Sequence, residues 1–443
     1  MCASSRFLSL CSSFRYRVFP FVQTLICFKM LGGNRQHYYI GLAVFIVFAS
    51  FTIFLSRQDD HVLYNQIGKV PYKCASTGVD GSAKPALSDA ISAVFDSIKH
   101  DPSNPEYIDG SGKKFVANQT IWTKPFGKRL LIVDIDTRVP TDENQILNPA
   151  KLNFEEMEMR GGGLVSNAIM NHYMYAMVHG YDYKYYQAQS IPDHYDTWIM
   201  PHAFRDLIED YQFVVALDAD VVLSHIEVPL EWMFNRWGIQ QHTSMALPWD
   251  TEEIKNGVPV SLDSKGLRVL NTGFVVAQNS PTTIDMLEKW RDCTTETRYH
   301  GCGRWKQEWS HEQRAFSEYI RYDYNFTAET IVPIDCDDAV GWPGFAADNP
   351  QNPGISDCSG NFVRHYTLSK SKVKDAGIMS VMNPLANILQ TQLLKQQSSV
   401  WYKEPERVEE AKDEDEPGKA AENTEERKEE EKDEALILVG LGN

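Results

Sequence analysis

The chain has 443 residues, of which 43% are hydrophobic and 12% aromatic, so it can bury a large core and is not disordered throughout. About half of its net charge of −17 comes from 403–434, which carries 16 acidic and 7 basic residues. The rest is only mildly acidic, which argues against general nucleic-acid binding.

The N-terminal part carries a membrane signal. The run from Tyr38 to Leu55 contains 18 residues without a charge, which is long enough to cross one bilayer. Basic residues precede this run, and Asp59 and Asp60 follow it. The positive-inside rule then predicts a single-pass type II protein, with 1–37 as cytoplasmic tail, 38–55 as anchor and the remainder lumenal. A cleaved signal peptide is disfavoured because the run is long and far from the start.

Cysteines and glycosylation acceptors fit a lumenal body. The cysteines after the span are Cys74, Cys293, Cys302, Cys336 and Cys358. Sequence neighbours suggest pairs of the second with the third and of the fourth with the fifth, leaving Cys74 free or intermolecular, although pairing cannot be deduced from sequence. Asn118 and Asn325 each begin an acceptor motif for N-glycosylation.

A stem and then a parallel sheet are predicted next. Residues 56–127 are rich in Gly, Ser, Pro and Lys and predict a lumenal stem. Strands and helices then alternate over Arg129–Asp134, Leu164–His179, Tyr183–Gln187, Phe204–Ile208 and Phe213–Leu217. Gly180 is a natural C-cap for the first helix. This alternation is typical of a parallel sheet with right-handed crossovers.

The strand Phe213–Leu217 ends in two carboxylates, Asp218 and Asp220. Residues two apart on a strand point the same way, so both side chains can reach one cation. Two hard oxygen ligands without a thiolate suit Mg²⁺ or Mn²⁺. Ligands of open α/β sheets bind at this edge. The alternative is a strand end followed by a solvated acidic turn.

Further elements follow this pair. Short strands are predicted at Met245–Leu247, before Asp250, and at Val275–Gln278, after the turn Asn271-Thr272-Gly273, in which Gly273 relieves the backbone. One helix is capped by Ser280 with Pro281 at its first position, and another runs from His311 through Ile320. The tail 401–443 is acidic and of low complexity, either a solvated helix or disordered.

Five blocks resemble one family. They are Tyr175–Asp182, Val214–Asp220, Leu270–Phe274, Glu312-Gln313 and His365. In this order they are similar to the Golgi α-glycosyltransferases that include fungal α-galactosyl- and α-1,6-mannosyltransferases and plant xyloglucan xylosyltransferases. The resemblance implies a GT-A fold, in which helices flank a Rossmann-like, mostly parallel sheet, here over a catalytic domain at 128–400. It further implies retaining transfer of a galactosyl or mannosyl unit from UDP-galactose or GDP-mannose to a glycan acceptor in the Golgi.

The resemblance also implies roles for single residues. Asp218, Asp220 and His365 would hold Mn²⁺ or Mg²⁺, and Lys370 matches a basic position that contacts the donor diphosphate. Glu312 and Gln313 match a catalytic pair at the donor sugar, while Asn271, Thr272 and Gly273 are assigned to donor binding, with a plain turn as the alternative. The chain departs from the family in His311-Glu312-Gln313, where the family more often has Asp-Asp-Gln, and in Trp198-Ile199-Met200, where the family has Trp-x-Lys.

The chemistry suits these residue types. A leaving nucleoside diphosphate gains negative charge, so a metal and a lysine stabilise the transition state more than the ground state. Glu312 can steady an oxocarbenium-like centre or attack it, whereas Gln313 can only form hydrogen bonds. Since 364–372 is polar, we expect His365 and Lys370 on one mobile segment that closes over the donor, with His365 binding the metal as neutral imidazole.

Other functions remain open at this point. Asp134 and Asp136 follow an apolar run, as in haloacid-dehalogenase phosphatases, with Asp337-Asp338 as a late metal pair. Those enzymes want Thr or Val where this chain has Arg138-Val139, and they are rarely lumenal. A non-catalytic, lectin-like subunit of a glycosyltransferase complex would keep the fold without activity. Taken singly, His365 has the alternative of an ordinary strand-end histidine, and Glu312 that of a solvated acid in the first turn of a helix.

Overall fold

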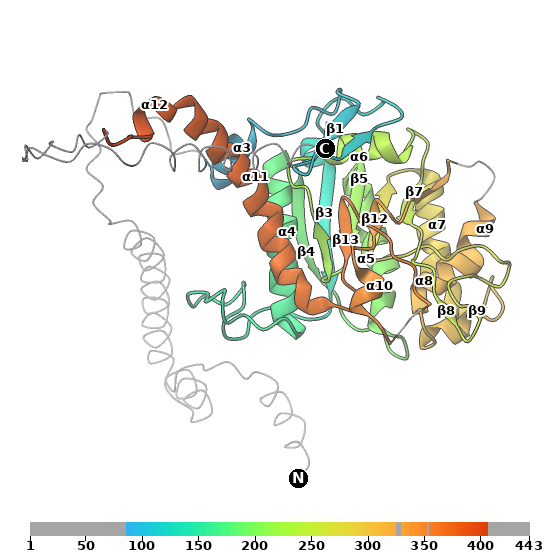
Figure 1. Cartoon of the computed structure of the whole chain (residues 1–443). Coiled ribbons are helices and arrows are strands. Elements are labelled where there is room, and N and C mark those ends of the chain that lie inside the picture. The colour runs from blue at the N-terminus through green and yellow to red at the C-terminus, as the bar shows by residue number, and fades with distance from the viewer. Residues whose placement is uncertain (1–85, 325–328, 352–353, 406–443) are drawn as a thin grey trace, which may run out of the picture. The chain divides into compact units, whose positions relative to one another are not determined.

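The computed structural model describes residues 86–324, 329–351 and 354–405 (Figure 1). The predicted anchor 38–55, its cytoplasmic flank, Cys74, Asn325 and nearly all of the acidic tail lie outside the described residues. Among those that are described, no helix is long and apolar enough to cross a membrane. The chain divides into two units between Ala83 and Lys84, and every described residue belongs to the second.

A six-stranded sheet forms the centre of this unit, in the order β11-β7-β10-β5-β3-β4. The strands are β3 (Leu130–Asp136), β4 (Asp182–Gln187), β5 (Phe213–Leu217), β7 (Met245–Pro248), β10 (Phe274–Gln278) and β11 (Ile331–Ile334). Neighbouring strands run parallel, except that β10 is antiparallel to both β5 and β7. The predicted α/β class with a mostly parallel sheet is confirmed, and the reversed strand is an addition to it.

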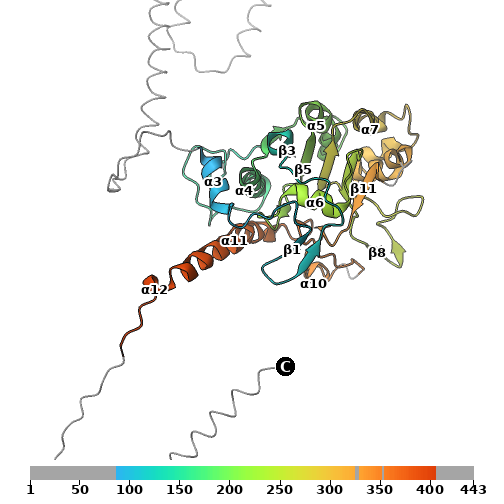
Figure 2. The same cartoon turned by 90° about the horizontal axis from the view of Figure 1, so that it is seen from above.

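Helices cover both faces of the sheet, which is why the central strands are apolar along their whole length. On β5, Phe213 and Val215 pack into one core with α4 (Gly161–His179) and α6 (Leu230–Trp237). Val214 and Ala216 pack into another core with α5 (Ile199–Leu207) and α7 (Pro281–Arg291). Figure 2 shows α5 and α7 on one side of the strands and α6 on the other.

The helix boundaries agree with the predicted caps. The α-helices are α3 (Leu87–Phe95), α4 (Gly161–His179), α5 (Ile199–Leu207), α6 (Leu230–Trp237), α7 (Pro281–Arg291), α8 (His311–Ala315), α9 (Arg321–Asp323), α10 (Phe345–Asp348), α11 (Val373–Lys395) and α12 (Gln397–Val400). A π-helical turn, Phe316–Ile320, joins α8 to α9. Gly180 ends α4 with a φ of 73°, and Ser280 Oγ accepts from the backbone N–H of Thr283 at 3.1 Å, so both predicted caps are confirmed.

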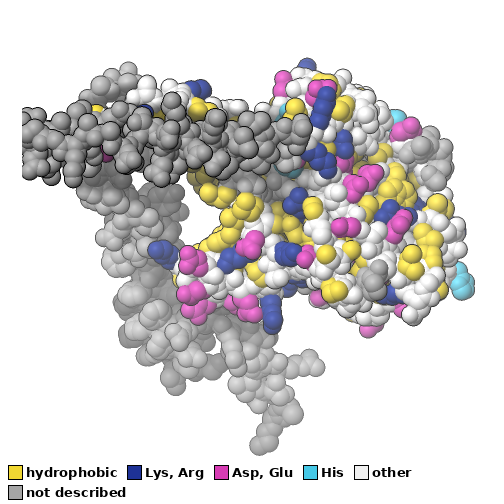
Figure 3. Space-filling view, in the orientation of Figure 1, with side chains coloured by type: hydrophobic (Ala, Val, Ile, Leu, Met, Phe, Trp, Pro, Cys, Tyr) yellow, Lys and Arg dark blue, Asp and Glu magenta, His cyan; other side chains and the backbone are white. Residues whose placement is uncertain are grey.

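Smaller sheets complete the unit. Strand β13 (Val363–His365) lies between β12 (Ala339–Val340) and β6 (Val221–Leu223), and two hairpins are formed by β1 (Glu106–Ile108) with β2 (Lys114–Val116) and by β8 (Ile254–Lys255) with β9 (Val258–Pro259). Short 3₁₀ turns lie at Gly127–Arg129, Asp196–Trp198, Ile208–Asp210, Cys293–Thr295, Cys302–Lys306 and Lys370–Lys372. Basic and acidic side chains are interspersed on the face that Figure 3 shows.

The predicted stem, 56–127, is wrong for the part that the structure describes. Phe95, Tyr107, Phe115, Trp122 and Phe126 are all buried in the same core as β5 and α6. The Trp122 indole N–H also donates to the carbonyl of Ile239 at 2.8 Å. A Gly- and Pro-rich composition masked these spaced aromatic anchors. The boundary of the globular unit therefore lies near Lys84.

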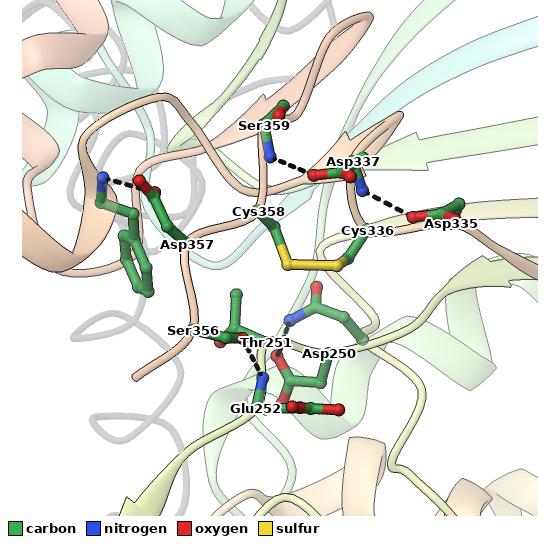
Figure 4. The surroundings of a disulfide bond; sticks show 12 residues. Asp250, Thr251, Glu252, Asp335, Cys336, Asp337, Ser356, Asp357, Cys358 and Ser359 are labelled. Carbon is green, nitrogen blue, oxygen red and sulfur yellow. Dashed lines mark hydrogen bonds between the residues drawn. A yellow bond between two sulfur atoms is a disulfide. The ribbon is translucent and has the colours of Figure 1, made fainter. Parts of the chain in front are cut away.

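Both predicted disulfides form. Cys293 pairs with Cys302 and Cys336 with Cys358, with Cα atoms 5.8 and 5.5 Å apart. Figure 4 shows the second bond, which joins the loop after β11 to the segment before β13. Close by, Ser356 Oγ accepts from the backbone N–H of Glu252 at 2.9 Å. The Cys336–Cys358 disulfide therefore fixes a loop next to Asp250.

Candidate functional site

The site lies where β5 ends. Asp218 and Asp220 occupy a turn between β5 and β6, and His365 ends β13, which pairs with β6 so that His365 faces Val221. The backbone N–H of Tyr366 donates to the carbonyl of Asp220 at 2.8 Å. A strand pairing thus places a histidine from far along the chain beside the two carboxylates.

The three side chains form a compact donor set. One ligand atom from each of Asp218, Asp220 and His365 lies within 4.8 Å of the others. His365 Nε2 is 3.2 Å from Asp220 Oδ1 and 3.7 Å from Asp218 Oδ2. Asp220 and His365 are buried, whereas Asp218 is partly exposed. Two carboxylates and an imidazole within this radius fit one Mn²⁺ or Mg²⁺ ion.

A neighbouring amide sets the tautomer of the imidazole. Asn271 Oδ1 accepts from the backbone N–H of Gly273 at 2.9 Å and lies 3.1 Å from His365 Nδ1. Because this oxygen can only accept, Nδ1 carries a proton and Nε2 faces the carboxylates. Metal-binding histidines are commonly oriented in this way.

Gly273 makes room for this imidazole. A Cβ on Gly273 would lie 2.2 Å from His365 Cε1, and the φ of Gly273 is not among the positive ones. The prediction that Gly273 serves backbone relief is therefore wrong, since close approach of His365 is the reason. Because β10 is antiparallel to β5, its first residues lie at the edge where β5 ends. Asn271, Thr272 and Gly273 reach the site for this reason.

The charges of this group are coupled. Burial raises the pKa of Asp218 to about 6, against the lowering effect of His365. Burial alone would raise the pKa of Asp220, but His365 and Lys370 together hold it below its ordinary value. Burial would lower the pKa of His365, and the two carboxylates raise it instead. The carboxylate pair thus attracts positive charge, here supplied by His365 and by Lys370 Nζ, which hydrogen-bonds Asp220 Oδ2.

Glu312 is buried and held at both oxygens. The hydroxyl of Thr197 donates to Oε2, and that of Thr272 donates to Oε1 at 2.9 Å. Burial raises the pKa of Glu312 to about 7, although both hydroxyls lower it. A carboxyl group that is fixed in place and titrates near neutral pH is suited to a catalytic role.

Gln313 is engaged by protein groups at both ends of its amide. Its Oε1 accepts from the backbone N–H of Thr272 at 3.0 Å, and its Nε2 donates to Asp250 Oδ2 at 3.0 Å. In this arrangement it positions Thr272 and Asp250. The structure brings all nine predicted site residues together. A series of contacts runs from Lys370 through Asp220, His365, Asn271, Asp250, Gln313 and Thr272 to Glu312. Asp218 and Gly273 lie beside His365.

Asp250 is a site residue that sequence reasoning missed. Its Oδ1 accepts from Asn271 Nδ2 at 3.1 Å, and burial raises its pKa. Asp250 follows the end of β7, which runs in the same direction as β5. Its position after an apolar strand is the signal that could have found it, by the same argument that singled out Asp218.

Two predictions need correction here. His365 lies in a buried strand, and Tyr366 and Val373 are core residues, so the picture of a weakly anchored segment that includes His365 is wrong. Lys370 comes after that strand and its side chain is 50% exposed. The phosphatase alternative finds no support in the contacts of its residues. Asp338 is paired with Arg236, and Asp136 with Arg138.

Comparisons with known proteins leave the family undetermined. No family model and no curated protein sequence matches the chain. Among solved structures, a glycosyltransferase involved in the glycosylation of the major capsid of PBCV-1 shares 10% identity at a TM-score of 0.33, over 56% of this chain and 98% of that one. Mouse xyloside xylosyltransferase 1 shares 11% identity at a TM-score of 0.32, over 55% of this chain and 99% of that one. The glycosyltransferase GlyE of Streptococcus pneumoniae TIGR4 shares 12% identity at a TM-score of 0.30, over 63% of this chain and 67% of that one. Likeness this weak carries no argument about function, which has to rest on the residues.

Proposed function

We propose that the chain is a metal-dependent, retaining glycosyltransferase of the GT-A type. It moves a galactosyl or mannosyl unit from UDP-galactose or GDP-mannose to a glycan acceptor. The observation that carries the proposal is the donor set of Asp218, Asp220 and His365 within 4.8 Å, with Lys370 beside it, at the end of β5. A type II anchor at 38–55 and a Golgi location belong to the same proposal and rest on the sequence.

The residues divide the work of breaking the glycosidic bond. Asp218, Asp220 and His365 would hold Mn²⁺, which when bound supplies positive charge for the leaving diphosphate. Lys370, half exposed beside Asp220, adds a second positive charge on the same side. Because charge develops mainly in the transition state, both contributions raise the rate more than the affinity for the donor.

Glu312 is the group suited to the sugar side of that bond. The two threonine hydroxyls fix its oxygens, and its ionised form can stabilise an oxocarbenium-like centre or attack it. Since its pKa is about 7, roughly half of the molecules carry this charge at neutral pH. Transfer should therefore rise with pH through the pKa of Glu312.

Donor hydrolysis tests the proposal. The full chain is incubated with UDP-galactose, UDP-glucose, UDP-xylose or GDP-mannose, with Mn²⁺ or with EDTA, and release of the nucleoside diphosphate is measured. We expect hydrolysis of one donor with Mn²⁺ only, and its loss in Asp220→Asn. Hydrolysis of none of the donors would contradict the proposal. Glycan binding without hydrolysis would instead favour a lectin-like subunit.

A further inference from the structure

Three aromatic side chains contact one another in series, and the middle one, His311, precedes Glu312 in the chain. The ring centroids of Tyr195 and His311 are 3.7 Å apart, and those of His311 and Trp309 are 5.5 Å apart, both pairs edge to face. Trp309 is 73% exposed and Tyr195 is 46% exposed, whereas His311 is buried. Single exposed aromatic residues are common on protein surfaces, but three in contact beside a buried carboxylate are not explained by chance exposure.

The backbone under these rings is firmly held. The backbone N–H of Tyr195 donates to the carbonyl of Lys306 at 2.8 Å, and that of His311 donates to Glu308 at 2.8 Å. The indole N–H of Trp198 donates to the carbonyl of Trp305 at 2.9 Å. Two segments far apart in the sequence are thus fixed to each other. The backbone that carries Tyr195 and His311 is therefore fixed, and their rings move only by side-chain rotation.

His311 contributes an unused polar atom. Its Nε2 is buried and has no hydrogen-bond partner among the described residues. A buried polar atom without a partner costs stability, so its persistence calls for an explanation. A neutral imidazole nitrogen can bond to a hydroxyl group in either direction, as donor or as acceptor. A hydroxyl-bearing ligand that displaces a neighbouring ring would give this atom its partner.

The order of groups indicates which ligand fits. Contacts run from Asp220 and His365 through Asn271, Asp250, Gln313 and Thr272 to Glu312, and the middle ring of the aromatic row, His311, precedes Glu312 in the chain. If the metal group takes the diphosphate and Glu312 the donor sugar, the rings, which include the residue before Glu312, lie near the donor sugar. An acceptor has to reach the donor sugar, so a surface next to Glu312 is suited to hold it.

We infer that Tyr195, Trp309 and His311 form a subsite for the first sugar of the acceptor glycan. The C–H groups on one face of a pyranose carry partial positive charge and stack on the electron-rich face of an aromatic ring, here Trp309. His311 Nε2 bonds a hydroxyl of the same sugar. The inference rests on the proposed function, because Glu312 marks the reacting centre.

Glycan binding by the full chain tests the subsite independently of catalysis. Mannotriose, galactotriose and cellotriose are titrated by calorimetry into the parent and into Trp309→Ala, Trp309→Phe and Trp401→Ala. Trp401 is a matched control, since it is 67% exposed and comes after α12. We expect Trp309→Ala to lower the affinity for the glycan that the parent binds about tenfold and Trp309→Phe to retain most of it. Trp401→Ala should leave this affinity unchanged.

Kinetics then separate this inference from the proposed function. With a hydrolysed donor, Trp309→Ala should reduce transfer about tenfold more than it reduces hydrolysis without acceptor. Equal losses, parent-like glycan binding by Trp309→Ala, or a parent that binds none of the glycans would each overturn the subsite. If no donor is hydrolysed but glycan binding still depends on Trp309, the subsite stands and the proposed transfer fails.

Discussion

Two Asp-x-Asp pairs end neighbouring strands of one sheet, Asp134 with Asp136 on β3 and Asp218 with Asp220 after β5. Asp134 is still inside its strand and accepts hydrogen bonds from Tyr183 at 2.5 Å and from His172 at 2.6 Å. The β5 pair lies beyond its strand, beside His365. The motif therefore does not make a metal site by itself. Whether its carboxylates can bind a cation depends on the side chains that neighbouring elements place next to them.

The largest contrast is expected from removing one charge in each pair. Asp220→Asn should weaken Mn²⁺ binding by at least about 100-fold, because mutating a residue that only hydrogen-bonds a metal ligand already lowers metal affinity about 10- to 100-fold. Asp134→Asn should leave Mn²⁺ affinity within about threefold and lower the free energy of unfolding by about 1–3 kcal/mol. Calorimetric titration with Mn²⁺ and urea unfolding measure the two effects. Equal losses of Mn²⁺ affinity would remove the distinction between the pairs.

Glu312 provides a second contrast, in the pH dependence of stability. Its pKa is raised from 4.5 to about 7, so the folded protein binds this proton more tightly than the unfolded chain does. Its contribution to stability is therefore full below about pH 4.5 and declines as the pH rises to about 7, in total by roughly 3 kcal/mol. Glu312→Gln should remove that decline. Urea unfolding at pH 5 and pH 8 in EDTA checks this. The same change in the free energy of unfolding between the two pH values in parent and variant would refute it.

Gly273 tests the role of close approach. Gly273→Ala should push His365 away and weaken Mn²⁺ binding, with a loss of about 1–3 kcal/mol in stability from the added atom. Gly110→Ala is the control, because its Cβ would meet no atom within 4 Å. Should both alanines leave Mn²⁺ affinity unchanged, the position of His365 would not matter for the cation.

Asp250 should show the smallest effect on the metal. Asp250→Asn keeps the shape but weakens the hold on Asn271 Nδ2, through which His365 is oriented. We expect Mn²⁺ affinity to fall about tenfold, less than for Asp220→Asn. The same titration measures it, and a loss as large as that of Asp220→Asn would mark Asp250 as a ligand.

The sequence predicted the elements better than their directions. Apolar runs, Gly180 and Ser280 located strands and helix ends because those signals are local. The direction of β10 is not local, and it decides that Asn271 and Asp250 meet. The pairing of β13 with β6, which fixes His365, is likewise a long-range contact. The core residues before 128 were missed because separate aromatic side chains leave no periodic pattern.

The central claim is that Asp218, Asp220 and His365 hold one divalent cation. Electron spin-echo spectroscopy of Mn²⁺ bound to the full chain tests it most directly, because a coordinated imidazole nitrogen modulates the echo. The acidic tail could bind Mn²⁺ through carboxylates only, without this signal. We predict nitrogen modulation in the parent and its loss in His365→Ala. Bound Mn²⁺ without nitrogen modulation, or modulation that survives in His365→Ala, would contradict the claim.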